Sequence, residues 1–109
     1  MQVPLQITFQ DIEHSDFIEG RIREKVAKLE RFYDRIISVR VVVAAPHRSS
    51  THGNTVNVRI DINVPDKEIV INRQPESNHA YEDVYVVIRD AFEAAERQLK
   101  EEARIRRGE

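Results

Sequence analysis

Cysteine is absent from this chain of 109 residues, and glycine is scarce, with three residues in all. The absence of cysteine excludes disulfides, catalytic thiolates and zinc sites built on sulfur ligands. With so little glycine, the chain has no glycine-rich loop that could cradle a phosphate. A protein without cysteine fits a reducing compartment, and we expect a cytoplasmic location.

Long apolar runs are also missing. The apolar runs are no longer than Val41–Ala45, far below the roughly 20 residues that span a bilayer. The first residues, Met1–Gln6, contain neither a basic segment nor an apolar one, so no secretory signal is expected. We therefore expect no membrane partner.

The chain has no excess of positive charge. Its 17 basic and 19 acidic residues give a formal net charge of −2. Binding to a nucleic acid would therefore require the charges to be segregated on the surface. The length and a hydrophobic content of 40% predict one core, and hence a single domain over residues 1–109.

Alternating apolar and polar residues predict four β-strands. The pattern is cleanest over Val56–Val64, where even positions are apolar and odd positions, Asp61 among them, are polar and expected to face solvent. Pro46 cannot donate to a sheet and ends the strand before it, while Pro65 and Asp66 predict a tight turn. The expected strands are Leu5–Phe9, Ile36–Ala45, Val56–Val64 and Lys67–Arg73.

Two helices are expected from apolar residues at helical spacing. The first begins after a cap at Ser15 or Asp16, with Glu19 at the capping-box distance from Asp16. The second runs through the last third of the chain, after a cap at Ser77 or Asn78. The apolar stripe of the first helix, with steps of four, four, three and four, is Ile18, Ile22, Val26, Leu29 and Tyr33.

The resulting order is β-α-β-β-β-α. The last three strands should form an antiparallel meander, and the first should join them in parallel through a right-handed crossover. Strict alternation leaves one face of the sheet buried and the other wet. The prediction is an α+β two-layer sandwich: a four-stranded mixed sheet with both helices on one face, as in double-stranded-RNA-binding domains.

Two segments carry a family resemblance. In the first helix, Ala27-Lys28-Leu29-Glu30 is followed by Phe32–Ile36. In the last helix the matching residues are Asp83, Tyr85, Ile88, Arg97, Gln98 and Leu99. Together they resemble the ribosome hibernation promoting factors, also called ribosome-associated translation inhibitors or sigma-54 modulation proteins, which have the same order of elements.

This resemblance implies a function without catalysis or a cofactor. Such a factor binds the RNA of the small ribosomal subunit at the decoding channel and inhibits translation during stress or stationary phase. Basic residues along the two helices make the contacts. The partner implied is the small subunit, with no small-molecule substrate, and the sequence leaves open whether ribosomes dimerise.

The basic residues of the first helix gather on one side. On a wheel of about 100° per residue centred on Ile22, they fall roughly 60° to 180° from the buried face. Glu24 lies among them, whereas Glu19 and Glu30 fall on the opposite flank. A stripe of this kind would bind phosphates with release of counterions. The predicted RNA-binding residues here are Arg21, Lys25, Lys28, Arg31 and Arg35.

The last helix mixes its charges. Glu93–Arg97 and Glu96–Lys100 have the i, i+4 spacing of pairs that only stabilise a helix, so a structural reading and an RNA-binding reading both stay open. Tyr85 is either an aromatic at the edge of the core or a platform for a base. The predicted RNA-binding residues of this helix are Arg89, Arg97, Lys100 and Arg104.

Other chemistries find little support in the sequence. His47 and His52 share a loop, but their spacing matches no standard set of metal ligands. No pair of acids or Ser–His arrangement points to catalysis, so no metal, cofactor or enzymatic activity is predicted. The alternative function, favoured by the near-neutral charge, is a protein–protein interaction or regulatory domain that does not bind RNA.

Overall fold

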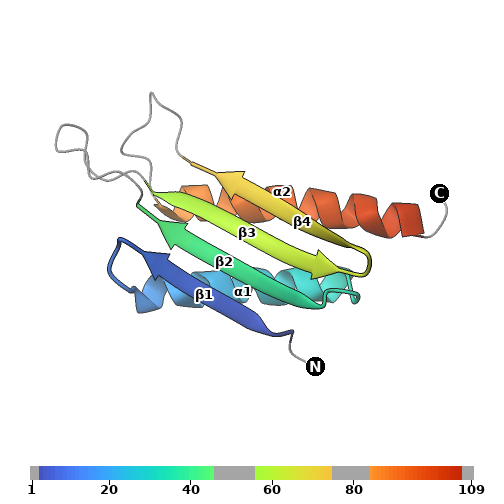
Figure 1. Cartoon of the computed structure of the whole chain (residues 1–109), viewed down its shortest axis with the longest axis horizontal. Helices are drawn as coiled ribbons and strands as arrows, with labels where there is room; N and C mark the ends of the chain where they lie inside the picture. Colours follow the sequence, from blue (N-terminus) through green and yellow to red (C-terminus); the bar gives the residue numbers. More distant parts are fainter. Residues whose placement is uncertain (1–2, 46–55, 75–83, 107–109) are drawn as a thin grey trace.

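The computed structural model describes residues 3–45, 56–74 and 84–106. These residues form four strands and two helices in the predicted order (Figure 1). The elements are β1 (Leu5–Gln10), α1 (Asp16–Phe32), β2 (Ser38–Ala44), β3 (Asn57–Val64), β4 (Lys67–Arg73) and α2 (Val84–Arg106).

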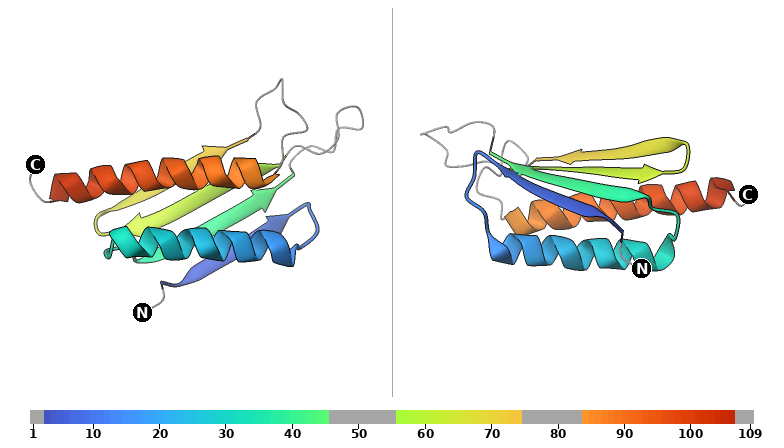
Figure 2. Two further views of the ribbon diagram at one scale, coloured as in Figure 1. Left: turned by 180° about the vertical axis from the view of Figure 1, so that it is seen from behind. Right: turned by 60° about the horizontal axis from the view of Figure 1, so that its bottom comes forward.

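The strands form one sheet in the order β1-β2-β3-β4. β1 pairs with β2 in parallel, and the other two pairings are antiparallel. Both helices cover the same face and leave the other face open (Figure 2). This architecture confirms the predicted two-layer α+β fold, including the meander and the parallel position of the first strand.

Differences from the predicted boundaries are small. β1 continues one residue further, to Gln10, and β2 begins at Ser38 rather than Ile36. The predicted loop at 46–55 and the predicted cap at Ser77 or Asn78 lie outside the described residues. In the described ranges no helix has the length and apolarity that crossing a bilayer requires.

Ser15, not Asp16, caps α1. The Ser15 side chain accepts a hydrogen bond of 3.2 Å from the Ile18 backbone N–H, which satisfies one of the free donors at a helix start. Glu19 turns away from the cap toward His14 and Arg23. Hydrogen bonds from these two residues, His14 first, lower the pKa of the Glu19 carboxyl.

The turn between β3 and β4 follows from two residues. Proline fixes φ near −65° at Pro65, and Asp66 has a positive φ of 70°. Proline followed by a residue of positive φ is the pattern of a type II turn. The turn sets the register in which Val64 faces Lys67, so the apolar positions of both strands meet on the helix side.

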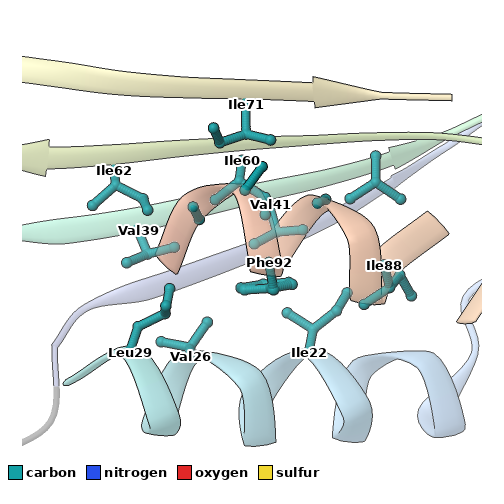
Figure 3. Close-up of a cluster of buried hydrophobic side chains, with 14 of the residues drawn as sticks. Ile22, Val26, Leu29, Val39, Val41, Ile60, Ile62, Ile71, Ile88 and Phe92 are labelled. Carbon is teal, nitrogen blue, oxygen red and sulfur yellow. The ribbon is translucent and has the colours of Figure 1, made fainter. Parts of the chain in front are cut away.

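The core fills the space between the sheet and the helices (Figure 3). The whole predicted stripe of α1 is buried, from Ile18 to Tyr33. The stripe of α2 includes Ile88, Phe92 and Leu99, each at most 3% exposed. The strands contribute Val39, Val41, Ile60, Ile62 and Ile71, among others.

Asp61 corrects one prediction. It points away from the helices, as the alternation requires, but it is 8% exposed rather than solvated. The register places it between Arg40 and Val70 on the same face of the sheet, and its Oδ1 accepts a hydrogen bond of 2.9 Å from Arg59 Nε. The carboxyl group raises the pKa of Arg59, chiefly through this hydrogen bond. Longer neighbours on a central strand can thus bury a polar residue on the open face.

A second buried acid ties the far end of α2 to the sheet. Glu102 is 8% exposed, and its Oε2 lies 3.2 Å from Lys67 Nζ at the start of β4. A carboxylate that is taken out of water needs such a partner. The contact holds the last turns of the long helix against the β3–β4 hairpin.

Tyr33 offers a direct test of packing at the end of α1. It is 4% exposed, and its hydroxyl has no hydrogen-bond partner in the described part of the chain. A buried hydroxyl without a partner costs about 1–3 kcal/mol. We expect Tyr33→Phe to raise the free energy of unfolding by about 0.5–1 kcal/mol, measured by urea denaturation.

Tyr85→Phe is the control for this substitution, because its ring is only partly buried. We expect no gain in stability from Tyr85→Phe. A loss of stability in Tyr33→Phe would mean that the Tyr33 hydroxyl is hydrogen-bonded in solution.

Candidate nucleic-acid interface

The two helices lie side by side and run in the same direction, with their N-terminal ends together (Figure 2). Near those ends a groove of about 210 Å³ opens between them. Arg21 and Lys25 of α1 line one side, and Tyr85, Val86 and Arg89 of α2 line the other. Three predicted RNA-binding cations, drawn from both helices, thus meet in one place. We call it the cationic groove.

An aromatic ring forms part of the groove wall. Tyr85 packs against the edge of the core, and the Arg21 guanidinium carbon lies 5.8 Å from the centre of its ring. A cation over an aromatic face is held by the electrostatics of the ring. The ring therefore orients Arg21 at the groove, and Tyr85 is an aromatic at the core edge.

The cations of the groove are only weakly engaged by acids. Arg21 lies 3.7 Å from Glu24, and Arg89 lies 3.4 Å from Asp90, in pairs whose side chains are about half exposed or more. Exposed pairs of this kind contribute about 0–1 kcal/mol, so a phosphate can compete with them. Lys25 makes no ion pair with any described residue.

Further along the two helices, on the C-terminal side of the cationic groove, one acid contacts two of the predicted cations. The carboxylate of Glu96 lies 3.1 Å from Lys100 Nζ and 3.7 Å from Lys28 Nζ, which reaches across from α1. The hydrogen bond from Lys100, followed by the charge of Lys28, lowers the pKa of Glu96. Glu96 is therefore ionised at neutral pH and joins the two helices.

The other four predicted cations do not enter the groove. Arg31, Arg35 and Arg97 are exposed and make no ion pair within the described ranges. Arg104 pairs with Glu101, where α2 runs past the end of α1 (Figure 2). Arg104 also donates a hydrogen bond to Glu101. This hydrogen bond is the main cause of the raised pKa of Arg104.

Of the two helix pairs expected from spacing, one forms. Glu96 and Lys100 are in contact, whereas Glu93 and Arg97 make no ion pair among the described residues. The contact from Lys28 to Glu96 joins residues 68 positions apart in the sequence, and spacing along one helix cannot predict it. This contact could be predicted only if the two helices were already known to be parallel neighbours.

No metal centre is present in the part of the chain that the structure describes. No group of three or more histidine, aspartate or glutamate residues there could hold an ion. The two loop histidines, His47 and His52, lie outside the described residues.

Comparisons with known proteins identify the family of the chain. Residues 5–107 match the family model described as sigma 54 modulation protein / S30EA ribosomal protein. The chain belongs to this family. Membership confirms the resemblance to the hibernation factors and makes the chain a ribosome-associated protein. None of the curated proteins matches it.

Solved structures of similar proteins have the same fold. A ribosomal subunit interface protein from Coxiella burnetii superposes with a TM-score of 0.73 at 15% identity, covering 93% of this chain and 98% of that one. The N-terminal domain of Protein Y from Thermus thermophilus gives a TM-score of 0.70 at 20% identity, with the same coverage. The S30EA family fold therefore extends over nearly the whole chain.

Proposed function

We propose that this protein binds the RNA of the small ribosomal subunit at its decoding channel and inhibits translation by occupying it. The cationic groove would hold the phosphate backbone, and the helices would lie against the RNA. The protein would act by blocking the sites of messenger and transfer RNA, without catalysis.

The observation that carries this proposal is the composition of the groove. Its described lining contains three cations and no acid, although the chain as a whole has a net charge of −2. Acids on the far flank of α1 are engaged elsewhere: Glu19 by Arg23, and Glu30 by the Val3 backbone N–H at 2.9 Å. Local charge, rather than net charge, attracts a phosphate at contact distance.

The groove predicts how binding depends on salt. If each of its three cations meets one phosphate, the logarithm of the affinity should fall with the logarithm of salt concentration with a slope between about −2 and −3. Phosphate contacts position a protein without reading bases. Specificity would then come from the folded shape of the ribosomal RNA.

Sedimentation with purified subunits tests the proposal. We expect binding to small subunits with the salt dependence given above. We expect no binding when messenger and transfer RNA already occupy the subunit. Addition of the protein to a translation extract should lower the rate of synthesis. Binding that persists in the presence of both RNAs would place the contact outside the decoding channel and reject that part of the proposal.

A regulatory domain without RNA affinity is the alternative function. It predicts that the protein does not sediment with small subunits even at low salt. The same experiment therefore separates the two functions.

Glu96→Gln should strengthen binding. The substitution removes the negative charge that Lys28 and Lys100 share, so a phosphate no longer competes with this carboxylate for either lysine. We expect the affinity for small subunits to rise roughly 3- to 10-fold, with a salt slope steeper by about one. Titration at several salt concentrations measures both quantities.

Glu93→Gln is the matched control, since it removes the same charge from the same helix and Glu93 has no ion pair among the described residues. It should change the affinity little. Equal gains in both variants would mean that net charge, and not the carboxylate shared by the two lysines, governs binding.

A further inference from the structure

Phe17 is the most exposed of the large hydrophobic residues that the structure describes, at 83%. It occupies the first turn of α1. Single exposed apolar residues are ordinary on protein surfaces, so exposure by itself does not make a site. Its position relative to the cationic groove is what distinguishes it.

Phe17 lies on the flank of α1 that carries the cations. On a wheel of about 100° per residue centred on Ile22, it falls about 140° from the buried face, beside Arg21 at about 100°. It precedes Arg21 by one helical turn, and residues four apart on a helix are neighbours. Both helices begin at the same end (Figure 2), so Phe17, in the first turn of α1, lies one turn before Arg21, which lines the cationic groove.

The surface around the ring is open. Gly20, three residues on, has nothing within 4 Å of where a Cβ would be. Glycine inside a helix costs about 1 kcal/mol relative to alanine, and no packing contact requires it here. Without a side chain at position 20, a planar group can approach the ring of Phe17 from that side.

The nearby acids leave this flank mostly positive. Asp16 and Glu19 fall on the opposite side of the wheel, at about 120° and 60°, and both contact His14. Glu24 is the acid that shares the flank, and it lies 3.7 Å from Arg21. An aromatic ring one turn before Arg21 on this flank therefore suits a partner that is both planar and anionic.

We propose that Phe17 stacks on an unpaired base of the RNA whose phosphates bind the cationic groove. The inference rests on the proposed function and adds the kind of RNA element that is bound. Aromatic side chains beside cations recognise single strands, loops and bulges, where bases are free to stack; bases inside a duplex are not accessible in this way. The bound element is thus a loop, bulge or strand rather than a continuous helix.

The absence of tryptophan from the chain makes the stacking directly observable. Phe17→Trp introduces a single indole at the proposed contact, and its exposed position leaves the core intact. We expect its fluorescence to be quenched on addition of small subunits, and of a single-stranded RNA oligonucleotide but not of its duplex. A blue shift without quenching would indicate a protein surface as the partner and would overturn the proposal.

Affinity gives the second measurement. Phe17→Leu keeps an apolar side chain but removes the ring, and should weaken binding to small subunits roughly 10-fold with an unchanged salt slope. Phe17→Trp should bind as well as the wild type. Val70→Ala, at an exposed residue on the open face of the sheet (44% exposed), is the control and should have no effect.

The outcomes separate this inference from the function on which it rests. If the wild type binds and Phe17→Leu binds equally well, the stacking is wrong and the groove stands. If the wild type does not bind small subunits at all, the proposed function fails, and the stacking with it.

Discussion

Reversing two charges across the groove, as Lys25→Glu with Arg89→Glu, should weaken binding to small ribosomal subunits by on the order of 100-fold, or about 2.7 kcal/mol. The two residues line opposite sides of the groove, so each variant carboxylate would repel a phosphate held between the helices. The salt slope should become shallower by about two, one for each cation lost. Sedimentation at several salt concentrations measures both changes.

Arg23→Glu with Arg40→Glu is the matched control. Arg23 lies on the other flank of α1, where it pairs with Glu19, and Arg40 lies on the open face of the sheet beside Asp61. Each pair of reversals takes the formal net charge from −2 to −6, two units per substitution. Thermal melting first establishes that both variants are folded. Equal losses of affinity would show that net charge, and not the groove, determines binding.

Truncating Ile60 to alanine should lower the free energy of unfolding by about 2–5 kcal/mol. Ile60 is fully buried on β3 and points toward both helices (Figure 3). Its removal leaves a cavity that a central strand, paired on both sides, cannot close. The total stability of a domain is about 5–15 kcal/mol, so the variant would lose a large part of it. Urea denaturation gives the value.

Two further substitutions calibrate this measurement. Ile60→Val removes one methylene and should cost about 0.5–1.5 kcal/mol. Val70→Ala, on the neighbouring strand but on the exposed face, should cost less than about 0.5 kcal/mol. If Ile60→Ala cost no more than Val70→Ala, the packing of the helices on this face of the sheet would be wrong.

The fold could be predicted because its signals are local and repeated. The alternation in β3 and the stripe from Ile18 to Tyr33 each require one face to be buried, and the structure buries those residues. Pro65 and Asp66 fix the hairpin. Once the order of elements is known, handedness and the shortness of connections leave few arrangements.

The candidate site could be predicted only in part. A wheel drawn on one helix finds the flank of Arg21 and Lys25, but it cannot show that Tyr85 and Arg89 complete the groove from the other helix. The ion pair between Lys28 and Glu96 likewise depends on tertiary contact. The burial of Asp61 was missed because alternation reports which face a residue is on, not how far its neighbours cover it.

The common direction of α1 and α2 gives the interface a polarity. Near the N-terminal ends the helix pair carries Arg21, Tyr85 and Arg89, and further along it carries the pairs that Glu96 makes with Lys28 and Lys100. Antiparallel helices would place the start of one beside the end of the other, so each end would combine one N-terminus with one C-terminus. Here the two positions differ, so under the proposed function we expect an RNA strand, which has a 5′ and a 3′ end of its own, to bind in one sense and not in the reverse.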